Sequence, residues 1–274
     1  MASSRPLGDA PDRSYANKLE RFSGFIAPDL ATILADLAIA PGAKVLDVGC
    51  GVGSTTRVIA NMLGRDAQVV GMDLSLPHLR AATGQRDFEL VRADAAKLPF
   101  RAATFDLIWS CNTINHVADP VGTLTAFRGA LRPAGRVVLA QSGLLPEMYF
   151  AWDAPLDDAV RNACHAYYRD RYHLSHADTA GVRGLVRLVR ASGLRLGRVH
   201  TVTIERVHPL AEADRAYFAE TIFEGTWGER LKPYLGADEW QALVHNTDPR
   251  SSDYCLERPD FHHLQTLTIC IGHA

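Results

Sequence analysis

The chain has 274 residues, a formal net charge of −2 and 47% hydrophobic residues. This composition is typical of a globular protein with a sizeable core, and it lacks the basic excess of many nucleic-acid-binding proteins. Five scattered cysteines without a C-x-x-C pair predict neither a disulfide framework nor a structural zinc site. Residues 1–12 lack the apolar segment of a leader, and no apolar run could cross a bilayer. We therefore expect a cytoplasmic protein without a nucleic-acid or membrane partner.

The first elements predict a nucleotide-type pocket. Residues 14–38 have helical spacing of apolar residues, interrupted near Pro28 because proline removes a backbone hydrogen bond. The stretch Val45–Gly53 is a short apolar segment that ends in three glycines, as expected of a buried parallel strand and a tight turn. Ser54 is expected to cap the helix that follows. A strand, a glycine turn and a helix in this order form a pocket at the carboxyl end of a sheet.

The rest of the chain alternates strands with helices. Strands are predicted at Gln68–Met72, Phe88–Arg92, Phe105–Ser110, Arg136–Gln141, Arg198–Arg206 and His262–Ile271, and helices at Leu76–Ala82, after Asp119–Pro120 and at Thr179–Ala191. This order predicts an α/β fold, a Rossmann-like and mostly parallel seven-stranded sheet with helices on both faces.

Two stretches, 142–178 and 207–260, interrupt the alternation and are rich in aromatic residues. We predict a single domain over 1–274, with a core at about 40–141, 179–206 and 261–272. The segment 14–38 is then an N-terminal helical cap, and the two stretches are helical lid insertions. Such lids would form a dry pocket for a small molecule that is aromatic or hydrophobic. For any one ring, ordinary packing within the lid is the alternative.

An acid inside the first strand changes the expected ligand. Asp47 precedes a G-x-G-x-G turn, whereas dinucleotide folds have G-x-G-x-x-G and no acid at this place. A carboxylate there repels a pyrophosphate and attracts an ammonium or sulfonium group. The stretch resembles motif I of the class I S-adenosyl-L-methionine (SAM) methyltransferases, D-x-G-x-G-x-G. The order of the seven strands is similar to the core of the same family.

Two further stretches match this resemblance. Asp73 closes the second strand, where an acid can accept both hydroxyls of a ribose; a solvated turn residue is the alternative. The stretch Asp94–Phe100 resembles the family's adenine-binding segment, D-A-x-x-L-P-F. The resemblance implies a SAM site made of Tyr15, Asp47, Gly49, Cys50, Gly51, Gly53, Asp73, Leu74, Asp94, Ala95, Ser110 and Cys111. Leu74 would contact the adenine face, and Asp94 would accept from its amino group.

The segment Ser110–His116 helps to distinguish among the types of methyltransferase reaction. It lacks the (N/D)-P-P-(Y/F) run of enzymes that methylate DNA amines, and the chain has no Pro-Cys dipeptide for cytosine-C5 chemistry. It resembles the ubiquinone/menaquinone-biosynthesis type, roughly S-x-x-x-(L/I)-H-H, with Asn115 at the first histidine. Candidate bases are His116, His165, His173 and Tyr168; for His116 a structural role is the alternative. The pair His173-x-x-His176 lacks a third ligand, so no metal is predicted.

The resemblance implies SAM-dependent methyl transfer to a small molecule in biosynthetic or secondary metabolism, with O-methylation as the expected reaction. N- or C-methylation and a non-methyl reaction such as a cyclisation would use the same pocket. Methylation of a protein and a non-catalytic relative also stay open. An NAD-dependent oxidoreductase is disfavoured by the glycine spacing. A homodimer is one option for the assembly.

Overall fold

The computed structural model describes residues 13–82, 87–142, 149–150, 152–172 and 181–274. The chain divides into two compact units. The first unit contains Met1–Gln141, Val182–Thr201 and Thr268–Ala274, and the second contains Ser142–Gly181 and Val202–Leu267. Both stretches expected to be insertions fall within the second unit. Their action as lids stays a prediction.

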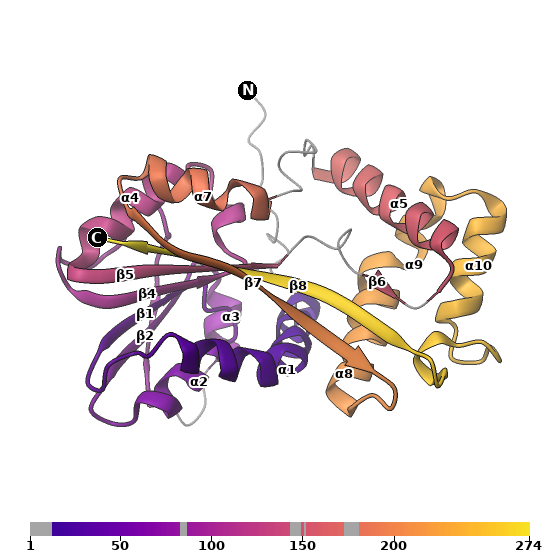
Figure 1. Ribbon diagram of the computed structural model, residues 1–274, viewed down its shortest axis with the longest axis horizontal. Helices are drawn as coiled ribbons and strands as arrows, with labels where there is room; N and C mark the ends of the chain where they lie inside the picture. The colour runs from indigo at the N-terminus through magenta and orange to yellow at the C-terminus, as the bar shows by residue number, and fades with distance from the viewer. Residues whose placement is uncertain (1–12, 83–86, 143–148, 151, 173–180) are drawn as a thin grey trace. The chain divides into compact units, whose positions relative to one another are not determined.

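A largely parallel sheet forms the centre of the first unit (Figure 1). Its strands are β1 (Lys44–Val48), β2 (Gln68–Asp73), β3 (Glu89–Arg92), β4 (Phe105–Cys111), β5 (Leu131–Ser142), β7 (Arg195–Val207) and β8 (His262–His273). Residues 202–207 of β7 and 262–267 of β8 belong to the second unit. The order is β3-β2-β1-β4-β5-β8-β6, where β6 (Tyr149–Phe150) is a two-residue strand antiparallel to β8, and β7 also pairs with β8. The pairs among β1 to β5 are parallel. The predicted mostly parallel sheet of seven strands is confirmed, with the short β6 as an eighth strand. Figure 1 shows β7 and β8 running in opposite directions.

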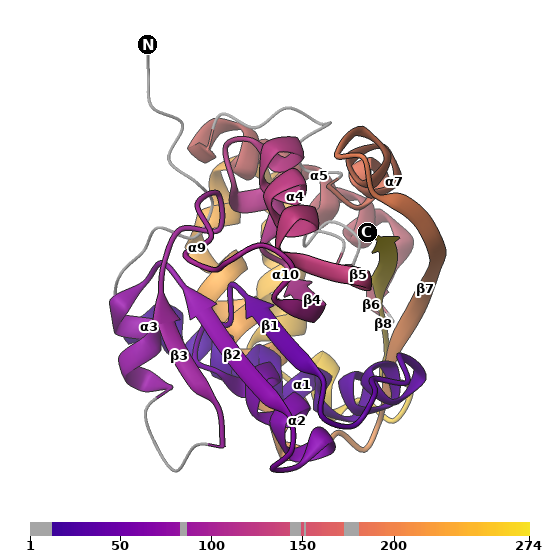
Figure 2. The same ribbon diagram turned by 90° about the vertical axis from the view of Figure 1, so that its left-hand side faces the viewer.

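Helices cover both faces of this sheet. The elements are α1 (Arg13–Asp36), α2 (Ser54–Leu63), α3 (Leu76–Ala81), α4 (Pro120–Ala130), α7 (Gly181–Ala191) and the short 3-10 helix η1 (Ile114–His116). Helices α4 and α7 contribute Leu124, Phe127, Leu185 and Val189 to the main core beside the strands. Helices α1 and α2 lie on the opposite face, as Figure 2 shows. The sheet is therefore buried on both sides, as its continuous apolar strands require.

Helix α1 differs from its prediction, because it runs from Arg13 to Asp36 without interruption and contains Pro28. A proline inside a helix costs about 3 kcal/mol. The apolar side of this helix, which includes Phe25, Ile26 and Leu34, is fully buried. Burial of several such side chains contributes more than that cost, so packing overrides the local preference.

Two further boundaries differ from the prediction. Gly53, not Ser54, is the N-cap of α2, because its φ of 76° places the backbone in the left-handed region. Ser54 is the first helical residue instead. Strand β5 also begins at Leu131 and not at the predicted Arg136. Residues 133–135 form an irregularity inside it, between the pairs Phe105–Leu131 and Leu107–Arg136.

The second unit is mainly helical and contains a cluster of aromatic rings. Its elements include β6 (Tyr149–Phe150), α5 (Ala154–Tyr172), α8 (Glu212–Ala216), the π-helix η3 (Tyr217–Trp227), α9 (Gly228–Leu231), η4 (Lys232–Tyr234), α10 (Ala237–Thr247) and η5 (Cys255–Glu257). The ring of Phe150 lies 5.5 to 5.6 Å from those of Phe218, Phe223 and Trp227. All four rings are buried, so they form the core of this unit, as the packing alternative expects.

Among the described residues, no helix is long and apolar enough to cross a membrane.

Candidate functional site

The carboxyl ends of four parallel strands bring the predicted cofactor residues to one edge of the sheet. The four strands lie in the order β3-β2-β1-β4. At their carboxyl ends Asp73 of β2 pairs with Arg92 of β3, and Val48 of β1 pairs with Met72 of β2. The sequence order reverses direction at β1, and ligands of open α/β sheets bind at such a switch point. Except for Tyr15, the predicted cofactor residues all lie at or beside this edge. The backbone of Tyr15 belongs to α1, but its side chain lies outside the described part of the chain.

The glycine turn after β1 has a backbone that only glycine adopts without strain. Gly49, Gly51 and Gly53 have φ values of 74°, 54° and 76°. A Cβ on Gly49 would lie 2.1 Å from Oγ1 of Thr113, so the turn also passes directly against the segment after β4. On Gly51 a Cβ would lie 3.1 Å from Leu19 of α1. The helix that was expected to cap the core therefore does reach the turn.

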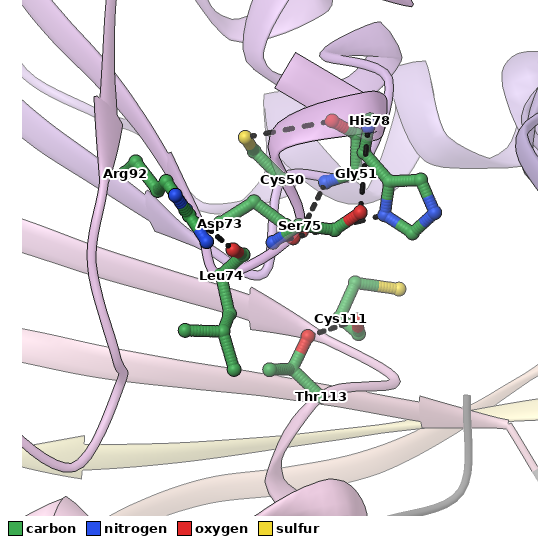
Figure 3. A network of polar contacts seen from close by, with 9 residues as sticks. All are labelled: Cys50, Gly51, Asp73, Leu74, Ser75, His78, Arg92, Cys111 and Thr113. Atoms are coloured by element: carbon green, nitrogen blue, oxygen red, sulfur yellow. Dashed lines mark hydrogen bonds and ion pairs between the residues drawn. The ribbon is translucent and has the colours of Figure 1, made fainter. Parts of the chain in front are cut away.

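Asp73 connects this turn to the end of β2 (Figure 3). Its Oδ2 accepts from the backbone N–H of Gly51 at 2.9 Å, and its Oδ1 accepts from that of Ser75 at 2.8 Å. Burial alone would raise the pKa of Asp73, but hydrogen bonds from the His78 side chain, Ser75 and Gly51 outweigh it and lower the pKa. The carboxylate is thus ionised and keeps further lone pairs for the two hydroxyls of a ribose.

An apolar surface and an unused donor lie beside Asp73. Leu74 is 56% exposed, which is unusual for a leucine that begins a loop beside a buried strand end. The Arg92 side chain donates from Nε to the Leu74 carbonyl at 3.2 Å and so fixes this part of the loop. Asp94 is exposed and accepts from Ala96 N through Oδ1. The backbone N–H of Ala95 makes no hydrogen bond with the described residues. These groups suit a planar heterocycle with polar edges.

Asp47 lies beneath the turn and is 2% exposed. Burial raises the pKa of this carboxyl to about 7, although a hydrogen bond from Thr56 Oγ1 at 2.6 Å opposes the shift. A cation placed nearby would favour the ionised form. Asp47 therefore provides a negative charge that depends on pH near neutrality.

The end of β4 contributes Ser110 and Cys111. The hydroxyl of Ser110 is buried and makes no hydrogen bond with the described residues. Burial raises the pKa of the Cys111 thiol to about 12, and burial likewise raises that of Cys50. Both thiols are protonated at neutral pH, so neither acts as a thiolate nucleophile. Figure 3 shows Thr113 beside Cys111, where its hydroxyl donates to the Cys111 carbonyl at 2.9 Å.

Comparison with known proteins matches residues 46–139 to a family described as "Methyltransferase domain". The chain is 39% identical over 125 residues to a malonyl-[acyl-carrier protein] O-methyltransferase of Pseudescherichia vulneris, which covers 44% of this chain and 49% of that protein. It is 27% identical to a demethylmenaquinone methyltransferase of Bacillus cytotoxicus, over 60% of this chain and 75% of the other. The chain contains a class I SAM-dependent methyltransferase domain.

The overall fold agrees with this assignment. A chain in the complex of the Haloferax volcanii Trm112 methyltransferase activator with a putative methyltransferase has a TM-score of 0.58 over 99% of both chains, at 19% identity. At this identity the likeness shows the fold alone. The chain spans about half the length of the O-methyltransferase relative.

The edge of the methyltransferase domain fits SAM on its own geometry. Asp73 offers carboxylate oxygens for a ribose, Leu74 offers an exposed apolar face for adenine, and the buried Ser110 hydroxyl lacks a protein partner among the described residues. The turn at Gly49 packs against Thr113 and leaves no room for a side chain, which fixes the backbone beside these groups.

The predicted bases fall in different places. His116 ends η1 in the first unit, and burial lowers its pKa to about 4, which makes it neutral but only weakly basic. His165 and Tyr168 belong to α5 of the second unit, where the Tyr168 ring contacts Tyr167 at 5.5 Å. His173 lies outside the described residues. A catalytic role for any of the four stays a prediction.

Sequence reasoning missed several residues that position the site. Thr56 holds Asp47, His78 lies 3.7 Å from Asp73, and Thr113 packs against Gly49. The sequence contains a signal for His78, because Ser75, three residues before it, precedes a proline-containing first turn and is a typical N-cap. Its side chain accepts from the His78 backbone, which places His78 beside the acid. Thr56 and Thr113 carry no such signal.

Proposed function

We propose that the protein transfers a methyl group from SAM to a small-molecule acceptor, by O-methylation in biosynthetic metabolism. The observation that carries this proposal is the convergence of Asp47, Asp73 and Asp94 from three neighbouring strands around the glycine turn. The O-methyltransferase relative supports oxygen as the acceptor atom. Bound SAM would supply an electrophilic methyl group on a sulfonium.

The residues of the edge would then bind and orient the cofactor. Asp73 would accept from the ribose hydroxyls, Leu74 would pack on the adenine, and Asp94 with the Ala95 N–H would contact the polar edge of the ring. Asp47 would favour the cationic end of the cofactor. Alignment of the methyl group with an acceptor and exclusion of water are the main contributions that a protein makes to such a displacement.

The surroundings of His116 support an acceptor that is already ionised. With a pKa lowered to about 4 by burial, His116 is a poor base for a neutral hydroxyl, since a general base works best when its pKa is near the operating pH. A carboxylate acceptor needs no deprotonation and requires only positioning. We therefore propose a carboxylic acid with an apolar or aromatic body as the acceptor class.

The second unit supports the apolar part of this acceptor. Its most buried rings form the core described above, whereas Tyr167, Tyr168, Tyr234 and Trp240 are only partly buried. The Tyr167 ring contacts those of Tyr168 and Tyr234, which join α5 to η4. These partly exposed rings are our candidates for contact with the acceptor. A role of this unit as a lid, with 14–38 as a cap on a single domain, remains part of the proposal.

The test is turnover of SAM with a panel of aliphatic and aromatic carboxylates and matched phenols. We expect S-adenosylhomocysteine and a methyl ester to form in equal amounts with a carboxylate, and both products to form far more slowly in the Asp73→Asn variant when SAM is near the concentration that half-saturates the wild type. Methylation of phenols alone would contradict the carboxylate proposal. A changed substrate without S-adenosylhomocysteine would instead favour a non-methyl reaction such as a cyclisation.

The five cysteines are all free thiols, which supports the proposed cytoplasmic location, where thiols are kept reduced. The homodimer remains a prediction.

A further inference from the structure

A hollow of about 240 Å³ lies in the first unit at the edge opposite the glycine turn. It is lined by the end of α1, the beginning of β5, the beginning of β7 and the end of β8, through Asp36, Leu37, Arg136, Arg198, His200, Ile271 and His273. Arg136 pairs with Leu107 near the amino end of β4, so the hollow lies at the amino ends of the parallel strands. None of the predicted cofactor residues lines it.

The lining is rich in groups that carry positive charge. Arg136, Arg198, His200 and His273 face a single acid, Asp36. Burial lowers the pKa of His200, and the charge of Arg198 lowers it further while Asp36 opposes the shift. Burial also lowers the pKa of His273, together with the charges of Arg195 and Arg136. The lowered pKa values hold the two histidines toward their neutral form, and Arg136 and Arg198 together carry one positive charge more than Asp36 balances.

Side chains of the neighbouring strands β7 and β8 line the hollow together. Side chains two residues apart share one face of a strand, which pairs Arg198 with His200 on β7 and Ile271 with His273 on β8. Gly197 brings the two strands close at this point, because a Cβ there would lie 2.6 Å from Nε2 of His273. The His273 ring thus lies against the backbone of β7.

The donors of the hollow are only partly used within the described part of the chain. The Arg136 guanidinium donates to the Leu37 carbonyl at the end of α1, and a guanidinium has further N–H groups beyond that bond. Nδ1 of His200 is buried and makes no hydrogen bond with the described residues. Buried polar atoms of native proteins are ordinarily paired, so an unpaired nitrogen beside two arginines indicates a missing anionic partner.

We propose that this hollow binds a small oxyanion of the phosphate class, held by Arg136 and Arg198 with His200 and His273 as additional donors. Guanidinium groups match the oxygens of phosphate in a bidentate geometry. The volume is below that of pockets for drug-sized ligands, so a phosphate group fits but a whole nucleotide does not. The anion is either free phosphate or the terminal group of a monoester whose body stays outside.

Calorimetric titration of the full chain with inorganic phosphate and with glycerol phosphate tests this site without any use of SAM. We expect saturable binding that weakens about tenfold or more in Arg198→Gln and in His200→Gln, because each removes a charge-assisted or buried hydrogen bond. The matched control is Arg187→Gln, which removes an exposed arginine from α7 in the same unit. Tighter binding of the ester identifies a monoester as the ligand, and equal binding identifies free phosphate.

Sulfate gives a second readout, because its charge is constant between about pH 6 and pH 8, where histidine titrates. Binding of sulfate should strengthen as the pH falls and should take up protons, since the anion favours the charged form of His200 and His273. Absence of saturable binding by the wild-type protein would overturn the proposal. Equal weakening in Arg187→Gln and Arg198→Gln would overturn it as well, because it would indicate general surface charge.

Discussion

Replacement of Asp73 by asparagine is expected to lower the affinity for SAM about a hundredfold. Hydrogen bonds to a charged acceptor contribute about 1.5–3 kcal/mol each, and two ribose hydroxyls would lose the same carboxylate. The amide also places a donor against the backbone N–H of Gly51 or Ser75, both of which now donate to Asp73. Titration with SAM and with S-adenosylhomocysteine measures the loss for both ligands.

The control for this variant is Asp66→Asn, which changes an exposed aspartate in the turn before β2 of the same unit. It should leave the affinity for SAM unchanged. Thermal unfolding of both variants separates loss of the ligand contacts from loss of the turn. If Asp73→Asn stays folded and binds SAM as tightly as the wild type, the ribose does not lie at this carboxylate.

Replacement of Asp47 by asparagine should stabilise the protein without ligand while weakening its affinity for SAM. The pKa of Asp47 is raised from 3.8 to about 7 by burial, so the native state holds a proton that the unfolded state releases between these two values. The stability that this proton contributes is present at low pH and is lost as the pH rises toward 7. At pH 8 the variant should therefore gain up to about 4 kcal/mol in free energy of unfolding over the wild type.

The pH dependence separates this effect from a general change in packing. The gain of Asp47→Asn should shrink as the pH falls from about 7 and disappear only below about pH 3, where the wild-type carboxyl is neutral in both states. The affinity of the wild type for SAM should rise between about pH 6 and pH 8 as Asp47 ionises, and the variant should lack this rise. A constant stability difference across this range would show that Asp47 is not the titrating group.

The order of strands and helices could be predicted from the sequence because each strand is a short apolar run with a clear stop. The glycines of the cofactor edge could be placed because they follow directly on the end of β1, whereas Asp47, Asp73 and Asp94 were assigned to the cofactor through the resemblance to the family's motifs. The uninterrupted helix α1 could not be predicted, because the burial of Phe25 and Leu34 that compensates for Pro28 depends on distant parts of the chain.

Contacts between segments far apart in the sequence were also missed. Thr56 lies nine residues from Asp47, and Thr113 lies against Gly49 only because β4 pairs with β1. The cationic hollow unites residues from α1, β5, β7 and β8, and none of them has a local pattern. Periodicity reports which face a residue occupies, but it does not report which distant residue it meets.

The most direct measurement is parallel calorimetric titration of the purified protein with SAM, S-adenosylhomocysteine and NAD. We predict micromolar binding of the first two ligands, as expected if the ribose hydroxyls and the cationic end of the cofactor meet Asp73 and Asp47, and no binding of NAD, whose pyrophosphate would meet the Asp47 carboxylate. Binding of NAD without binding of SAM would contradict the assignment of the glycine turn as a SAM site.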